Sequence, residues 1–318
     1  MSACLTINSF NMGASIGNYL QLCQHKDNNF HILDPEQKAF QAKYEAVQNK
    51  AAELLCGTSD VYCLQEVGDM SRPIINKLQN SQYTIIHLHG AEKFGTAIAL
   101  RQAEFYDITN QSFEVELAPN EKYDVAVASA THSTGKRMTF ISMHVPGFPF
   151  EDVSEPESRP GDLYTRAVAT KLSQIAKGRL QVIGADMNAN PAIYHQAGVK
   201  FENRFSHLAH QGFQTCGIGY HTNVNPRSTP LYQQREIDFI FVNRPSLLQR
   251  IRSIFCSFTD ISVGITNKYS NWWNPEVNCS DHIPVNATLR FNTRPSQIAQ
   301  LWNKLISLFT RPNPKPVV

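Results

Sequence analysis

Six short apolar runs along this chain each carry, at one end or within the run, a polar side chain that can bind a cation or move a proton. These side chains are Asn11, Glu66, His144, Asp186 with Asn188, Asp238 and the pair Asp281-His282. Strands of a rigid sheet commonly present reactive groups at their ends, so we expect these residues to meet in one site. A site built from residues 11 to 282 requires one large domain, which we place at 1–291, with 292–318 as an extension.

Composition restricts the partners and the compartment. The formal net charge is +2, so no strong global field attracts nucleic acid or an anionic membrane, and any attraction of anions must be local. The seven cysteines form no C-x-x-C pair. We therefore expect reduced thiols and a cytoplasmic protein. No secretory signal precedes the first apolar run, and no run is long enough to span a bilayer. The oligomeric state is left open.

The pattern of apolar residues predicts alternating strands and helices. Asp34 and Pro35 mark a helix start, an apolar stripe at helical spacing follows, and Gly57 marks the end. Asp162 is expected to cap a second helix after a long irregular loop at 146–161. A polar loop is expected at 221–234. Strands are expected at 4–10, 61–65, 83–89, 96–101, 112–117, 124–131, 137–143, 180–185, 236–242 and near 252–258, with a last strand that ends near 291.

The six polar clusters are rich in hard oxygen ligands. Carboxylates and amide oxygens suit Mg²⁺ or Mn²⁺ better than Zn²⁺, and Mg²⁺ usually shares its coordination with substrate phosphate oxygens. An imidazole oriented by a carboxylate can hold a proton for water or for a leaving group. Together these groups predict a metal-dependent site for the attack of water on phosphorus.

The clusters also occur as sequence motifs. In order, these are Phe10-Asn11-Met12-Gly13, Leu64-Gln65-Glu66-Val67, Ser142-Met143-His144, Gly184-Ala185-Asp186-Met187-Asn188, Ile237-Asp238-Phe239-Ile240 and Ser280-Asp281-His282-Ile283-Pro284-Val285. This series resembles the signatures of the endonuclease/exonuclease/phosphatase superfamily, which has the deoxyribonuclease I-like fold. The resemblance extends over residues 4–291, although Ala185 separates a Gly-Asp pair that is usually adjacent in the family.

The resemblance implies an α/β fold, a four-layer sandwich of two packed mixed β-sheets flanked by helices. It implies that Glu66 binds the metal with Asn11 beside it, and that Asp281 lies at the metal. Asp186 and Asn188 would position the attacking water and a phosphate oxygen. His282, oriented by Asp238, would act on water or phosphate, and His144 would contact the phosphate or protonate the leaving group.

The expected substrate is a phosphate ester, first of all a nucleic-acid phosphodiester. The alternative is a phosphoinositide or phospholipid at a membrane surface, because residues 292–318 combine a helical apolar stripe with unbalanced basic residues. That stripe either packs on protein or makes a peripheral membrane contact. A third alternative is a catalytically inactive interaction module. The pairs His87/His89 and His207/His210 lack the remaining ligands of a zinc site. Arg166 either reaches the site or is an exposed helix charge.

Overall fold

The computed structural model describes fourteen ranges of the chain. They are 2–13, 34–68, 71–87, 95–119, 121–146, 160–175, 180–189, 202–215, 223–225, 233–235, 237–243, 258–264, 280 and 282–292. Asp281, the loop at 147–159 and the tail at 293–318 lie outside these ranges, so the expectations for them stay predictions. Among the described helices, none is both long enough and apolar enough to cross a membrane.

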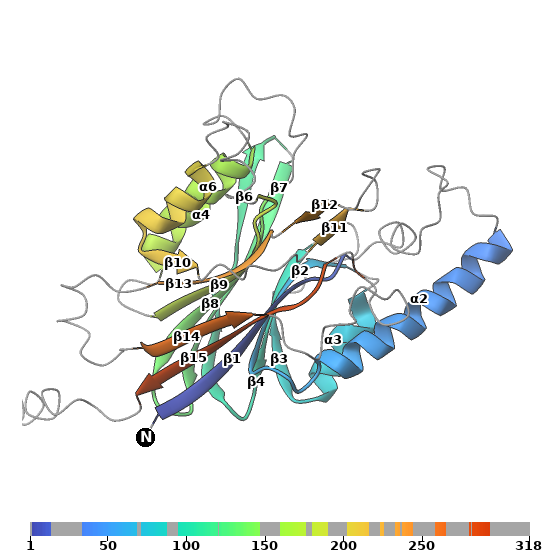
Figure 1. Cartoon of the computed structure of the whole chain (residues 1–318), viewed down its shortest axis with the longest axis horizontal. Coiled ribbons are helices and arrows are strands. Elements are labelled where there is room, and N and C mark those ends of the chain that lie inside the picture. The colour runs from blue at the N-terminus through green and yellow to red at the C-terminus, as the bar shows by residue number, and fades with distance from the viewer. Residues whose placement is uncertain are drawn as a thin grey trace, which may run out of the picture.

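Two mixed sheets form the body of the protein (Figure 1). The first sheet has the order β14-β15-β1-β2-β4-β3, in which only the pairing of β1 with β2 is parallel. Its strands are β14 (Phe258–Gly264), β15 (Val285–Asn292), β1 (Ser2–Asn11), β2 (Val61–Val67), β4 (Gly95–Arg101) and β3 (Tyr83–Ile86). The first and last strands of the described chain, β1 and β15, are therefore neighbours in this sheet.

The second sheet repeats this arrangement. Its order is β10-β13-β9-β8-β7-β5, with β6 also paired to β7, and only β8 and β9 run parallel. Its strands are β10 (Phe213–Thr215), β13 (Asp238–Asn243), β9 (Leu180–Asp186), β8 (Arg137–His144), β7 (Glu121–His132), β5 (Phe105–Asn110) and β6 (Phe113–Ala118). A separate pair, β11 (Asn223–Asn225) and β12 (Gln233–Arg235), is antiparallel.

Side chains alternate between the two faces of each strand and so build three apolar layers. On β2, Val61 and Cys63 point into the layer between the sheets, whereas Tyr62 and Leu64 point to the outer face. Helices α2 (Asp34–Leu55) and α3 (Arg72–Asn80) cover the outer face of the first sheet. Helices α4 (Pro160–Ile175) and α6 (Glu202–His210) cover that of the second. This is the predicted sandwich of two mixed sheets flanked by helices.

Several local predictions are confirmed. Tyr44, Val47, Ala51 and Leu55 form the buried stripe of α2, and Gly57 has the left-handed φ of +81° expected after the helix. The strands expected at 124–131 and 137–143 are the antiparallel neighbours β7 and β8, and Gly135 in the turn between them has positive φ.

Other predictions are wrong. Helix α4 begins at Pro160, so Asp162 lies inside its first turn instead of capping it. The region 221–234, expected to be a polar loop, contains strand β11 and part of β12. Residues 252–257 lie outside the described ranges, so the strand expected near 252–258 is tested only at Phe258, where β14 begins and from which it continues to Gly264. Helix α3 and strand β5 were not predicted, because α3 is short and β5 is mostly exposed and polar.

Candidate active site

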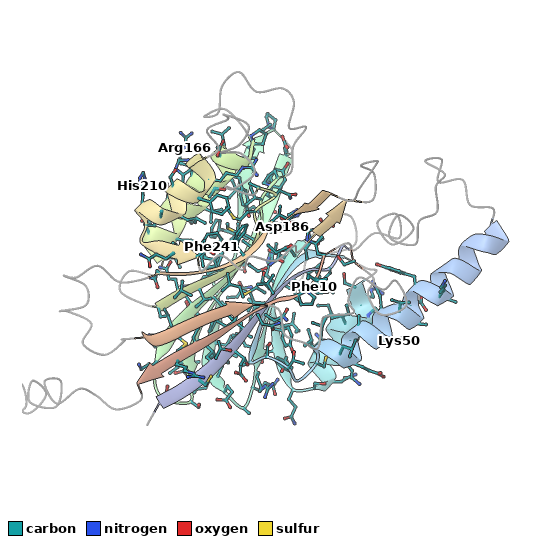
Figure 2. The ribbon with its side chains drawn as sticks, viewed as in Figure 1. Phe10, Lys50, Arg166, Asp186, His210 and Phe241 are labelled. Carbon is teal, nitrogen blue, oxygen red and sulfur yellow. The ribbon has the colours of Figure 1, made fainter. Side chains whose placement is uncertain are left out.

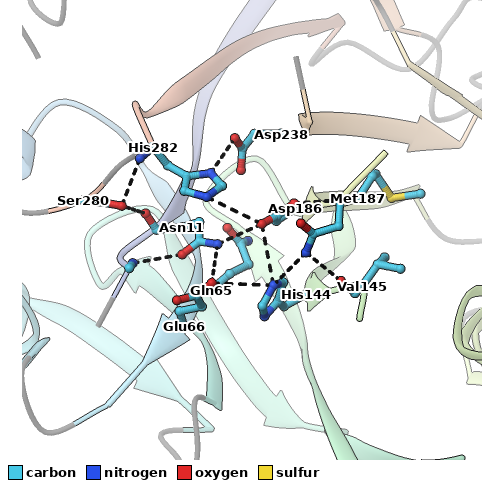
Figure 3. Close-up of polar contacts among 12 residues, drawn as sticks. Asn11, Gln65, Glu66, His144, Val145, Asp186, Met187, Asp238, Ser280 and His282 are labelled. Carbon is cyan, nitrogen blue, oxygen red and sulfur yellow. Dashed lines mark hydrogen bonds and ion pairs between the residues drawn. The ribbon is translucent and has the colours of Figure 1, made fainter. Parts of the chain in front are cut away.

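Strand register places three of the predicted residues in one row across the second sheet. His144 is paired with Asp186 across the parallel strands β8 and β9, and Asp186 is paired with Asp238 across the antiparallel strands β9 and β13. The first sheet presents Asn11 at the end of β1 and Glu66 near the end of β2. His282 lies just before β15. The site therefore spans the ends of both sheets (Figure 3).

Asp186 is the centre of this cluster. Its Oδ2 accepts a hydrogen bond from Asn11 Nδ2 at 2.8 Å, and its Oδ1 accepts one from the backbone N–H of Asn188 at 2.7 Å. The two imidazoles face the same Oδ2 from different directions, with His144 Nε2 at 3.6 Å and His282 Nε2 at 3.9 Å (Figure 3). Burial raises the pKa of the Asp186 carboxyl and the negative charge of Asp238 adds to this, while both imidazoles act in the opposite direction.

His282 is held by a buried carboxylate. Its Nδ1 lies 2.8 Å from Asp238 Oδ2, and only 6% and 1% of the two side chains are exposed. The neutral imidazole then carries its proton on Nδ1 and turns the lone pair of Nε2 toward Asp186. Ser280 fixes the backbone, since its Oγ donates to Asn11 O at 2.8 Å and accepts from the N–H of His282 at 3.1 Å.

His144 is held by an amide instead. Asn188 Nδ2 donates to Val145 O at 2.9 Å, and this bond fixes which end of the amide is nitrogen. The same nitrogen lies 3.0 Å from His144 Nε2. That contact requires a lone pair on Nε2 and hence a proton on Nδ1. The His144 side chain is 25% exposed, more than those of Glu66, Asp186 and His282, so it is the imidazole most open to a substrate.

Two residues of the site have strained backbones. Glu66 has φ +48° and Asn188 has φ +44°, in the left-handed region that residues with a Cβ seldom adopt. At Glu66, two residues of β2 face one residue of β4, so a bulge interrupts the alternation of side chains. Such strain persists where the surroundings hold it, and it occurs often at functional sites.

Two groups of side chains bring potential ligand atoms within 4.8 Å of one another. They are Glu66, His144 and Asp186, and Asp186, Asp238 and His282. Asn11 Nδ2 lies between two carboxylates of the site, 3.0 Å from Glu66 Oε1 and 2.8 Å from Asp186 Oδ2. Its Oδ1 accepts from the N–H of Gly13, so in this arrangement Asn11 turns its nitrogen toward the carboxylates. Carboxylate oxygens are the ligands that a hard divalent cation prefers, so the cluster fits such an ion.

The structure thus brings together seven of the eight predicted site residues, and the eighth, Asp281, is not described. The other candidates lie elsewhere. Arg166 is exposed on α4, and Figure 2 places it and His210 of α6 away from Asp186. His87 follows β3, and its Nε2 lies 3.7 Å from Asp124 Oδ1. Among the described residues, no group of potential metal ligands contains His87, His207 or His210.

Gln65 was not among the predicted site residues, but it joins the two sheets beneath the site. Its buried amide Nε2 lies within hydrogen-bonding distance of Ser9 Oγ in the first sheet and of Ser142 Oγ and Gly184 O in the second. Gly184 permits this close approach, because a Cβ there would collide with Cys63 and Ser9. The signal in the sequence was a glutamine inside an otherwise apolar strand, next to a candidate ligand.

The fold is shared with solved structures. The chain aligns with D. rerio TDP2 complexed with a single-stranded DNA product at 15% identity and TM-score 0.55, over 91% of this chain and 99% of that chain. It aligns with an endonuclease/exonuclease/phosphatase protein of Bacteroides vulgatus at 13% identity and TM-score 0.58, over 91% and 100% of the two chains. ANGEL2, a 2′,3′-cyclic phosphatase complexed with adenosine-2′,3′-vanadate, aligns at 15% identity and TM-score 0.56, over 91% and 96%. No family model matches the sequence, and neither does any curated protein.

Proposed function

Because the chain has the deoxyribonuclease I-like fold of the endonuclease/exonuclease/phosphatase superfamily, we propose that it is a divalent-metal-dependent hydrolase of phosphate esters. The observation that carries the proposal is the arrangement around Asp186 Oδ2. A buried Asp238–His282 pair faces this oxygen on one side, and Asn11 and His144 face it on the other. Two imidazoles and three carboxylates that meet at the ends of two sheets support a catalytic role over structural or capping roles.

Glu66 and Asp186, with Asp281 as the predicted further ligand, would hold the cation, and Mg²⁺ or Mn²⁺ suits these oxygens. Bound there, the cation would draw negative charge from the phosphate oxygens. Asn11 contributes by holding the Glu66 and Asp186 carboxylates on either side of one amide nitrogen. This contact fixes the spacing of two groups that belong to different sheets.

Asp186 and His282 are proposed to orient the attacking water. Asp186 Oδ2 and His282 Nε2 lie 3.9 Å apart, so one water molecule can form hydrogen bonds of about 2.8 Å to both groups. Either group can take the proton when the water oxygen attacks phosphorus. Asp238 keeps the imidazole in the required orientation and stabilises it when it becomes charged.

His144 and Asn188 are proposed to act on the phosphate. His144 is the more exposed of the two imidazoles and lies on the far side of Asp186 from Asp238 in the strand register. A histidine there can contact a phosphate oxygen or protonate the leaving group. Asn188 keeps the imidazole ring in place through the 3.0 Å contact with Nε2.

A nucleic-acid phosphodiester is the proposed substrate class. It is supported by two proteins of the same fold, one solved with a single-stranded DNA product and the other with an adenosine-2′,3′-vanadate. Since the net charge is only +2, binding would depend on a few local phosphate contacts.

The test is a hydrolysis assay with labelled single-stranded and double-stranded DNA and RNA, a 2′,3′-cyclic nucleotide and phosphoinositide liposomes, each with Mg²⁺ or with EDTA. The proposal predicts metal-dependent hydrolysis of a nucleic-acid substrate that is lost in Glu66→Ala. If the protein hydrolyses only the phosphoinositides, the nucleic-acid substrate class is wrong, but the proposed hydrolysis of phosphate esters stands. An Arg294→Glu/Lys304→Glu variant would then test the predicted peripheral membrane contact of 292–318. Inactivity on every substrate by a folded, metal-loaded protein would favour the inactive interaction module.

A further inference from the structure

Arg204 on α6 is a buried charged residue outside the cluster of predicted site residues. Its side chain is 0% exposed, and it is the largest of the fully buried side chains among the described residues. Taking a guanidinium group out of water is costly unless charged and polar partners surround it. The partners of Arg204 therefore indicate what the buried charge does.

The guanidinium joins three segments. Nε lies 4.0 Å from Oδ1 of Asp162, a 2% exposed carboxylate in the first turn of α4. Nη1 donates to Met187 O at 2.9 Å and to Asn188 O at 3.3 Å, in the segment that follows β9. Arg204 thus ties two helices to the backbone that carries a residue of the site.

The backbone of α4 leaves room for the guanidinium group. A Cβ at Gly161 would collide with the Cζ, Nη2 and Nε atoms of Arg204. The arginine is fully buried, so its end cannot swing into solvent to relieve such a clash. A glycine at this position is therefore needed for the arginine to lie where it does.

The held segment needs support. Asn188 has the strained left-handed φ of +44°. Its N–H is bound to Asp186 and its Nδ2 to Val145 and His144, while its carbonyl oxygen is bound to Arg204. Loss of the contact with Arg204 would leave the Asn188 carbonyl free to turn toward a relaxed φ, and the side chain would turn with it.

We propose that Arg204, paired with Asp162, is a positioning residue that holds Asn188 in its strained conformation and so fixes the imidazole of His144. It touches neither the candidate metal ligands nor a reacting atom in the contacts described. Its effect on turnover rests on the proposed function, whereas its effect on the His144 ring does not.

The test compares Arg204→Met/Asp162→Asn, which removes both buried charges together, with the conservative Arg204→Lys. A lysine keeps the charge but lacks the planar fork that serves the carboxylate and both carbonyls. The control is Leu208→Ala, which truncates another buried residue of the same helix whose apolar side chain donates no hydrogen bond to the carbonyl oxygens of residues 187–188. Folding of each variant is checked by circular dichroism.

The first readout is the nitrogen NMR spectrum of the histidine rings, with the His144 signals assigned from a His144→Gln variant. We expect the His144 signals to change in both Arg204 variants and to stay unchanged in Leu208→Ala, while those of the distant His132 move in none. Unchanged His144 signals in a folded Arg204 variant would overturn the inference, even if the protein hydrolyses nothing. Arg204→Lys keeps the test decisive if the double variant does not fold.

The second readout is kinetic. We expect kcat to fall by about 10- to 100-fold in Arg204→Lys with little change in KM, since the groups are misplaced by a fraction of an ångström to an ångström. Asn188→Ala should cost less activity when it is added to Arg204→Lys than when it is made in the wild type, because both changes disturb the same contact with His144. Full additivity of the two changes would contradict the inference and would leave the proposed hydrolase activity intact.

Discussion

Asp186 on β9 and Asp238 on β13 lie directly opposite each other on adjacent antiparallel strands, and both carboxyl groups are buried. Like charges in this position destabilise a sheet. The protein offsets the repulsion with His282, whose Nδ1 is 2.8 Å from Asp238 and whose Nε2 is 3.9 Å from Asp186. The two opposed carboxyl groups therefore lower the stability of the sheet, and they hold the His282 imidazole at a fixed angle.

Asp238→Asn should separate stability from activity. It removes one of two opposed charges, so the free energy of unfolding in urea should equal that of the wild type or exceed it by about 1 kcal/mol. Turnover should fall on the order of 10²- to 10⁴-fold, because His282 loses its orienting charge. A variant that is less stable and loses activity only in proportion to its unfolded fraction would show a structural role for Asp238.

Asp60→Asn is the matched control. This carboxylate lies before β2, at the end of the strand opposite to Glu66. It accepts hydrogen bonds from Thr6 N at 2.9 Å and from Thr6 Oγ1 at 2.7 Å. Its loss should lower the free energy of unfolding by about 1 kcal/mol and leave kcat unchanged. A stability change without a change in turnover is the reverse of the pattern expected for Asp238→Asn.

Glu66→Gln should weaken Mn²⁺ binding. Loss of the carboxylate charge next to Asp186 should raise the dissociation constant by at least about tenfold, and Asn11→Ala should raise it to a lesser degree. Isothermal titration calorimetry with Mn²⁺ measures both. Glu104→Gln, which changes a 37% exposed carboxylate in the turn between β4 and β5, should not alter binding. Equal Mn²⁺ affinity in wild type and Glu66→Gln would refute the metal role of Glu66.

Gly184→Ala should disturb the contact between the sheets. The new Cβ would collide with Cys63 and Ser9, and overpacking of this kind costs about 1–3 kcal/mol. Urea unfolding followed by fluorescence measures the cost. Gly135→Asn is the comparison, since nothing lies within 4 Å of its Cβ and asparagine enters the left-handed region at a lower cost than other residues with a Cβ. If Gly135→Asn lowers the free energy of unfolding as much as Gly184→Ala does, the cost comes from replacing a glycine and not from the contact between the sheets.

His132 should make stability depend on pH. Burial lowers the pKa of this histidine from its ordinary value of 6.5, and this outweighs the opposite effect of Glu104. The unfolded chain therefore binds the proton more readily, so the contribution of His132 is fully present above pH 6.5 and is lost as pH falls through the lower folded pKa. Urea midpoints measured from pH 7.5 to pH 5 should decline less in His132→Gln. If the urea midpoints of wild type and His132→Gln decline equally with falling pH, other titratable groups cause the decline.

Short-range patterns were enough to predict much of the sandwich. Apolar runs with strand spacing predicted most strands, and helical spacing predicted α2, because these segments bury one or both faces. The same logic predicted that residues as far apart as Asn11 and His282 would meet. The pair β11–β12 was missed because its strands are short and mostly polar. Helix α3 was missed because it has only nine residues, although Ile74, Ile75 and Leu78 form a buried face at helical spacing.

The supporting residues of the site were not predictable in the same way. Arg204 and Leu208 are one helical turn apart, so an arginine on the buried face of α6 was a visible signal, but its carbonyl partners depend on tertiary packing. The position of the Asn11 amide nitrogen likewise depends on its contacts with Glu66 of the first sheet and Asp186 of the second. Such contacts depend on how the two sheets approach each other, which no local pattern encodes.

The most direct test of the central claim is the rate of Mg²⁺-dependent cleavage of labelled single-stranded DNA and RNA by wild type, Asp186→Asn, His282→Ala and the Asp60→Asn control. We expect that wild type and the control cleave these substrates, that EDTA abolishes this cleavage, and that the rate falls on the order of 10³-fold or more in the two site variants. Cleavage that persists in Asp186→Asn and His282→Ala at the wild-type rate would contradict a site centred on Asp186.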